Sequence, residues 1–185
     1  MTRPIRLLLI ASSLWYFGEG LLGPLFAVFS EQIGGDVLDI TLAWAMYLIA
    51  SGIAYLVVGR LLNRSRWKFR MIAVGYALNT VCTFAYLLVH NTTDLLFVQI
   101  GLGVAEAIAT PTWDAFYASK LVDPDDTFAW GIAGGHTQLI SGVAIAIGGL
   151  IAKFVSFHAL FVTMGLISLA ATAVQIRLTI LEERT

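Results

Sequence analysis

The sequence predicts an all-α integral membrane protein whose six transmembrane helices form two inverted repeats of three. Three observations predict this fold. Of the 185 residues, 58% are hydrophobic and 12% are charged, whereas a water-soluble domain carries about 25% charged residues. Six apolar runs of membrane-spanning length follow one another, and the last three repeat features of the first three. A mean hydropathy of +0.83 agrees with this class.

Each apolar run is long enough to cross a hydrocarbon layer of about 30 Å as a helix that rises 1.5 Å per residue. The expected spans are residues 7–29, 40–59, 71–89, 95–118, 128–152 and 159–176. We interpret the first run as a span and not as a secretory signal, because no small-residue cleavage site follows it. The polar breaks between the runs are short, so we expect the activity to lie within the bilayer.

Basic residues predict how the chain is oriented, because they collect on the cytoplasmic side of a membrane. Ten of the eleven fall on one side of the predicted topology, and only Lys153 falls on the other. We therefore expect a multi-pass protein of the cytoplasmic (inner) membrane with both termini in the cytoplasm. Every copy should insert the same way round.

An internal repeat divides the single predicted domain, residues 1–185, into units of about 7–89 and 95–178. At an offset of 87 residues, Glu19 matches Glu106, and a proline and a phenylalanine that follow each glutamate also match. At an offset of 90 residues, Ser51 is followed by the same small residues as Ser141. An odd number of helices per unit inverts one unit relative to the other, as in many secondary transporters.

Several short motifs make the chain resemble one half of a major facilitator superfamily transporter, whose full members have two such six-helix halves. The family's loop between the second and third helices reads G-x-L-x-D-R-x-G-R-R/K, and residues 59–68 here read GRLLNRSRWK. Gly59, Arg64 and Lys68 match this motif, while Asn63 replaces its aspartate. The resemblance implies that these residues form a cytoplasmic gating loop, with Asp114 as an acidic partner that pairs with Arg64 or a neighbour. Contact with the substrate is the alternative role for Asp114.

Two other family motifs are only partly present. In the fourth helix the family has an arginine, where this chain has Gln99, although the following glycine and proline are kept as Gly103 and Pro111. In the fifth helix the G-P-x-x-G-G motif of exchangers becomes AIAIGG at residues 144–149. The lost Gly-Pro pair weakens the expectation of an exchange mechanism.

The resemblance also predicts an assembly. The chain starts with methionine and ends in a charged tail, so we expect two copies to supply what the family encodes in one chain. The two halves of the family are parallel and related by an axis along the membrane normal. A homodimer of chains that insert the same way round can form that symmetry.

Three carboxylates fall within predicted spans: Glu19, Glu106 and Asp114. Each would cost about 2.5–3.5 kcal/mol if it faced lipid at the centre of the bilayer. We therefore expect them to face a water-filled cavity or a partner subunit, or to be protonated. The hypothesis for Glu19 and Glu106 is that one of them binds and releases a proton during transport. The alternative is a permanently neutral carboxyl that is bonded to carbonyls freed by Pro24 or Pro111.

Helical spacing places other polar and aromatic residues on the same faces as these acids. The candidate residues for proton coupling or substrate binding are Glu19, Glu106, Gln99, His136, Tyr16, Trp113, Tyr47 and Ser51. For His136, a packing role is an equal alternative to binding or proton relay. For the aromatic residues, packing within the bundle is the commoner role. Trp67 and Trp130 are expected to anchor the chain at the membrane surface.

Taken together, the sequence predicts a secondary transporter of a small solute that works by alternating access as a parallel homodimer, with proton coupling as an open hypothesis. The alternatives are a non-transporting accessory subunit and an excised half of a longer transporter. An enzyme is not expected, because the sequence has no nucleophile–base pairing and no metal-ligand spacing. No cofactor, metal or nucleic-acid partner is expected.

Overall fold

The computed structural model describes residues 3–62 and 67–183, and the described residues form helices without strands. The helices are α1 (Arg3–Leu22), α2 (Leu25–Gln32), α3 (Val37–Leu62), α4 (Lys68–Ala85), the short 3₁₀ helix η1 (Tyr86–Leu88), α5 (Thr92–Lys120), α6 (Thr127–Phe154) and α7 (Phe157–Glu183). Six segments of the described chain are long and apolar enough to cross a membrane. The predicted all-α fold with six membrane helices is confirmed.

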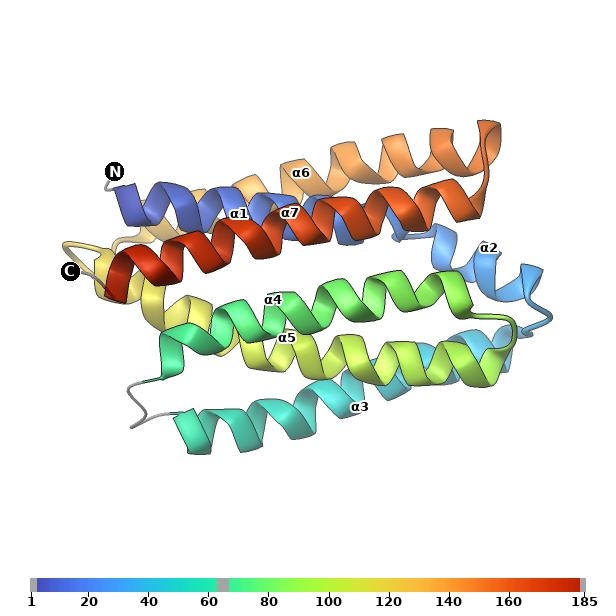
Figure 1. Ribbon diagram of the computed structural model, residues 1–185, viewed down its shortest axis with the longest axis horizontal. Coiled ribbons are helices and arrows are strands. Elements are labelled where there is room, and N and C mark those ends of the chain that lie inside the picture. Colours follow the sequence, from blue (N-terminus) through green and yellow to red (C-terminus); the bar gives the residue numbers. More distant parts are fainter. Residues whose placement is uncertain (1–2, 63–66, 184–185) are drawn as a thin grey trace.

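The long helices run along a common axis, and both termini lie at the same end of the bundle (Figure 1). We call this the terminal end, and it also carries the connection between α5 and α6. The connections from α2 to α3, from η1 to α5 and from α6 to α7 lie at the opposite, distal end. An even number of spans between the termini produces this arrangement.

Polar side chains in the loops cap the N-termini of several helices. Asp36 accepts hydrogen bonds from the backbone amides of residues 38 and 39 at the start of α3. Asn91 accepts one at the start of α5, and Asp126 accepts two at the start of α6. These caps satisfy amides that have no partner within a helix, and they fix where each span begins.

The first predicted span is broken. We expected one continuous helix over residues 7–29, but α1 ends at Leu22 and α2 begins at Leu25. Gly23 adopts a positive φ of 29°, which side chains disfavour, and Pro24 has no amide hydrogen for the helix ladder. Pro111, its partner in the repeat, lies inside a helix, because α5 continues past it.

The first long helix of each repeat packs against the helices of the other repeat. Helix α1 packs against α6 and α7 of the second unit, and α5 packs against α3 and α4 of the first. Helices α4 and α7 pack against each other between them, so that α3 and α6 lie on the outside (Figure 1). The set of contacts is unchanged when the two units are exchanged, as expected for a repeat whose units are inverted.

Glycines allow the closest helix crossings. A Cβ on Gly103 of α5 would lie 2.5 Å from the carbonyl oxygen of Tyr47 in α3, and a Cβ on Gly20 of α1 would lie 2.9 Å from the Cβ of Ala144 in α6. These two crossings join equivalent helices of the two repeats. Small residues are favoured at such contacts because they let the helix backbones approach closely.

A buried row of hydroxyl groups joins α4 to α7. The hydroxyl of Thr80 lies 3.0 Å from that of Ser168 and 2.9 Å from that of Thr172. The side-chain amide of Asn79 also donates to Ser168, at 3.3 Å. Hydrogen bonds of this kind between membrane helices contribute about 0.6 kcal/mol on average and up to about 1.7 kcal/mol.

We expect replacement of Thr80 by valine to lower the free energy of unfolding in detergent by about 0.6–2 kcal/mol, because the interhelical bonds are lost while the side-chain volume is kept. Thr163→Val is the matched control, since the hydroxyl of Thr163 bonds to a carbonyl of its own helix, that of Ala159. Denaturant unfolding followed by circular dichroism measures both. Equal destabilisation in the two variants would contradict the role of this row.

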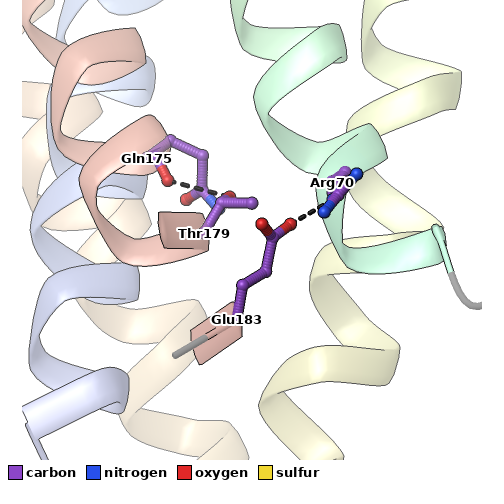
Figure 2. A network of polar contacts seen from close by, with 4 residues as sticks. All are labelled: Arg70, Gln175, Thr179 and Glu183. Atoms are coloured by element: carbon purple, nitrogen blue, oxygen red, sulfur yellow. Dashed lines mark hydrogen bonds and ion pairs between the residues drawn. The ribbon is translucent and has the colours of Figure 1, made fainter. Parts of the chain in front are cut away.

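Ion pairs close the terminal end of the same helices. Arg70 at the start of α4 pairs with Glu183 at the end of α7 (Figure 2). Lys120 at the end of α5 pairs with Glu182. Because the Arg70–Glu183 pair is more than 40% exposed on both sides, it contributes little to stability. The pair links the first turn of α4 to the last turn of α7.

The outer faces of α3 and α6 have few partners within the chain. Several glycines of these helices meet nothing within 4 Å at their Cβ positions: Gly52, Gly59, Gly131, Gly135, Gly142 and Gly149. Large apolar side chains such as Leu56 and Leu139 are 74% and 76% exposed. These faces are therefore available to lipid or to another protein.

Candidate functional site

The two glutamates of the repeat lie close together where α1, α3 and α5 meet. The hydroxyl of Tyr47 in α3 donates a hydrogen bond to a carboxylate oxygen of Glu106 in α5. Glu19 of α1 lies near enough to Glu106 for the two carboxyls to interact electrostatically. Both glutamates are partly buried. The structure thus brings together three of the eight predicted binding or coupling residues in one polar centre.

A cavity of about 180 Å³ opens from this centre toward the distal end, and we call it the distal cavity. Glu19, Tyr47 and Gln99 contribute its polar groups. Aromatic and apolar side chains form the rest of its wall: Leu22, Phe26, Trp44, Tyr86, Leu102 and Met164. Gln99 is buried, and the hydroxyl of Tyr86 donates to its carbonyl oxygen at 3.5 Å.

A second cavity of about 280 Å³ lies between α1, α4, α5 and α6, nearer the terminal end, and we call it the terminal cavity. Tyr16 and Trp113, both predicted, line it together with Asp114. Its wall also contains Trp15, Tyr76 and Trp130. Tyr16 lies within electrostatic range of Glu19, Glu106 and Asp114, so it connects the polar centre to this cavity.

His136 of α6 reaches α1 and does not line either cavity directly. Its Nδ1 lies 3.0 Å from the carbonyl oxygen of Ile132 and, since that oxygen can only accept, Nδ1 carries a proton. Its Nε2 lies 3.3 Å from the hydroxyl of Ser12, which lines the terminal cavity. The imidazole is therefore one hydrogen bond away from the cavity wall.

Ser51 takes part in helix packing and lies in neither cavity. It is buried where α3 crosses α5, and its backbone amide would lie 3.1 Å from a Cβ on Gly103. A larger side chain at this position would push the two helices apart. Tyr47 of the polar centre lies at the same crossing, since its carbonyl oxygen would lie 2.5 Å from that Cβ.

The predicted gating loop is described only in part. Asn63 and Arg64 lie outside the described residues, and so does the suggested pairing of Asp114 with Arg64. We placed Gly59 in a loop, but it lies inside α3, which continues to Leu62. Lys68 is the first residue of α4. Asp114 is exposed and lines the terminal cavity.

Sequence reasoning missed much of the terminal cavity. Trp130, which we expected to anchor the chain at the membrane surface, also lines this cavity. It donates to the carbonyl of Pro124 at 2.8 Å and packs edge-on against Tyr117. Trp15 and Tyr76 also line the cavity, and their ring centroids are 4.5 Å apart. For Trp15, the sequence offered one indication of a place in the cavity, which is that it directly precedes the candidate Tyr16. Tyr76 gave none, since it lies on an otherwise ordinary apolar helix.

Within the described residues, no group of three or more His, Cys, Asp or Glu side chains is arranged to hold a metal ion. The chemistry that the site offers is therefore that of carboxyl groups, phenols, indoles and one imidazole. Such groups can bind a solute, accept a cation or transfer a proton.

Comparison with known proteins identifies the family of the chain. The model of the Major Facilitator Superfamily matches residues 8–185, which is nearly the whole chain. The chain belongs to the Major Facilitator Superfamily. This confirms the resemblance that the loop and helix motifs suggested.

Three relatives illustrate the range of this superfamily. The proton-coupled antiporter flippase LtaA of Staphylococcus saprophyticus is 24% identical over 127 residues, which are 68% of this chain and 32% of that protein. The uncharacterized MFS-type transporter MJ1560 of Methanocaldococcus jannaschii is 26% identical over 157 residues, 85% of this chain and 40% of that protein. A probable L-galactonate transporter of Escherichia coli is 28% identical over 110 residues, 60% of this chain and 24% of that protein.

The chain matches at most 40% of the length of these superfamily members. It is thus a multi-pass membrane protein that corresponds to part of a superfamily transporter. All three relatives are named as transporters or flippases.

Proposed function

We propose that this chain forms a secondary active transporter of a small solute, which works by alternating access as a parallel homodimer and is coupled to protons. The terminal end is proposed to face the cytoplasm, because ten of the eleven basic residues lie at this side of the predicted topology. The units of about 7–89 and 95–178 are proposed as its inverted repeats.

One observation carries the proposal. The carboxyls of Glu19 and Glu106 lie between two cavities that extend toward opposite ends of the bundle, and each cavity is lined by residues close to this pair. A site near the middle of the membrane that can be reached from either side is what alternating access requires. Ionisable groups at this depth are costly and are commonly retained for a function.

The carboxyl pair can couple transport to protons. A carboxyl can take up and release a proton, and the two carboxyls lie within electrostatic range of each other. The hydroxyl of Tyr47 holds one oxygen of Glu106. The printed name of the LtaA relative includes proton coupling, which supports this part of the proposal.

A second copy would supply the half of the transporter that the superfamily encodes in the same chain. The outer faces of α3 and α6 carry glycines without close neighbours and exposed apolar side chains, as a close helix–helix interface needs. Chains that insert the same way round can meet through these faces about an axis along the membrane normal. On this model Gly59, Asn63, Arg64 and Lys68 act with Asp114 as a cytoplasmic gate.

Purification and reconstitution test the proposal. We expect the purified chain to have the mass of a dimer in detergent, measured by light scattering with the detergent contribution subtracted. We expect proteoliposomes that contain it to accumulate at least one solute from a panel of sugars, sugar acids, amino acids and small ammonium compounds when a pH gradient is imposed. A stable monomer would contradict the homodimer, and accumulation that ignores the pH gradient would contradict proton coupling.

A further inference from the structure

Where the structure describes the walls of the two cavities, their charged residues are all acids. Asp114 lines the terminal cavity and Glu19 the distal cavity, while Glu106 lies in the polar centre between them. Among the described residues, neither cavity is lined by a lysine or an arginine. The sequence has no basic residue at 7–59, 71–119 or 121–152, apart from histidines, so the spans of α1, α3, α5 and α6 supply none at mid-depth.

A carboxylate beside aromatic walls is stabilised in its charged form by a nearby cation. Lys120 pairs with Glu182, and the imidazole of His136 is engaged by Ile132 and Ser12. Among the described residues, no basic side chain forms an ion pair with Asp114. A bound cation can therefore supply its counter-charge when Asp114 is not engaged in the proposed gate.

Aromatic rings line the terminal cavity around the carboxylate of Asp114. Trp15, Tyr16, Tyr76, Trp113 and Trp130 all line the terminal cavity beside Asp114. Trp113 is held by stacking on Tyr117 at 5.1 Å with an angle of 16° between the rings, and Trp130 by its bond to the Pro124 carbonyl. Ring faces attract cations through their quadrupole, and aromatic cages beside an acid suit organic ammonium groups.

The size and polarity of the terminal cavity limit the kinds of ligand that it can bind. A volume of about 280 Å³ is at the lower end of the range of about 300–1,000 Å³ for small-molecule pockets. Ser12, Thr110, Thr137 and Gln138 add neutral polar groups to the wall. The cavity can thus take a small ammonium group together with a hydroxyl or amide, whereas an anion would meet only like charge.

We propose that the terminal cavity binds a small organic ammonium ion, with Asp114 as its counter-charge and the ring faces of Trp15, Trp113 and Trp130 around it. This inference names a substrate class for the site and rests on the proposed transport function. An anionic solute, such as a sugar acid, is excluded by the same charges.

Ligand binding to the purified chain in detergent tests this inference, with choline as the probe. The matched neutral compound is 3,3-dimethylbutan-1-ol, in which carbon replaces the charged nitrogen, and glucose is the sugar probe. We expect choline to raise the unfolding temperature with its concentration, because a ligand that binds only the folded state stabilises it. The alcohol and glucose should not. Equal stabilisation by the alcohol, stabilisation by glucose alone, or none by any probe would overturn the proposal.

Two pairs of variants locate the site. We expect Asp114→Asn to weaken choline binding by at least about ten-fold, the equivalent of 1.4 kcal/mol, and Asp125→Asn to leave it unchanged, because Asp125 is exposed in the loop before α6. Trp113→Leu should weaken binding in the same way, whereas Trp44→Leu, which alters the distal cavity, should not. Binding lost only in Trp44→Leu would place the site in the other cavity and overturn the proposal.

The comparison of choline with its neutral analogue uses the unmodified chain, so it remains decisive even if a variant does not fold. Binding in detergent requires neither transport nor a dimer. If choline binds but proteoliposomes show no uptake, the transport proposal fails alone. If a neutral solute or an anion is transported and choline does not bind, the inference about the substrate class fails alone.

Discussion

Replacement of Glu106 by glutamine is expected to abolish accumulation driven by a pH gradient, with a loss of about ten-fold or more in the solute gradient that the proteoliposomes reach. Glutamine keeps the size of the side chain and an oxygen that Tyr47 can still bond. It cannot take up or release a proton. We expect Glu19→Gln to act in the same way, because Glu19 is the other member of the carboxyl pair.

The assay separates coupling from binding. Exchange of labelled for unlabelled solute across the membrane needs no net proton movement, so we expect exchange to persist in both variants while accumulation is lost. Glu31→Gln is the control, since Glu31 is an exposed acid in α2 at the distal end. Full accumulation in both Glu19→Gln and Glu106→Gln would rule out the proton role of the pair. The solute used is the one with the largest uptake in the panel described above.

A valine at Gly148 is expected to prevent stable folding, with a loss of about 3 kcal/mol or more. A Cβ at this position would lie 1.9 Å from the carbonyl oxygen of Leu21 and 2.7 Å from its carbonyl carbon. Both atoms belong to the backbone of α1, so no side-chain rotation can relieve the clash. Helix α6 would have to move away from α1, and the close crossing between the two would be lost.

The neighbouring residue provides the control. A Cβ at Gly149 meets nothing within 4 Å, so Gly149→Val adds the same β-branched side chain to the same helix without the clash. We expect Gly149→Val to give a monodisperse, folded particle in size-exclusion chromatography, whatever its oligomeric mass. We expect Gly148→Val to aggregate or to give little protein. Similar behaviour of the two variants would contradict the α1–α6 crossing.

The charge and hydropathy of the chain were enough to predict the membrane fold, because crossing a bilayer imposes a length and a composition that are visible in sequence. The spans matched six observed helices to within a few residues at most ends. The break at Gly23 and Pro24 was harder to predict, because Pro111 occupies the equivalent position without ending its helix. A proline permits a break, and the surrounding packing determines whether the break forms.

Helical spacing predicted the polar centre more accurately than the cavities. It placed Glu106 on the inner face of α5, and the matching glutamate of the other repeat brought Glu19 to the same place. Spacing could not show that Tyr47 bonds to Glu106, since the two residues lie on different helices 59 positions apart. It also could not show that Ser51 is buried at the crossing of α3 with α5.

The sequence alone determined that this protein crosses a membrane six times, which end of the bundle carries the basic residues, and that acids lie at mid-depth, because each of these properties depends on local composition and length. Only the tertiary structure decided that the units exchange helices, that Trp15, Tyr76 and Trp130 share one cavity with Asp114, and that α3 and α6 keep open faces. These properties depend on how separate helices are rotated and paired. That choice is made by close packing between side chains distant in the sequence, which a periodic pattern on one helix does not encode.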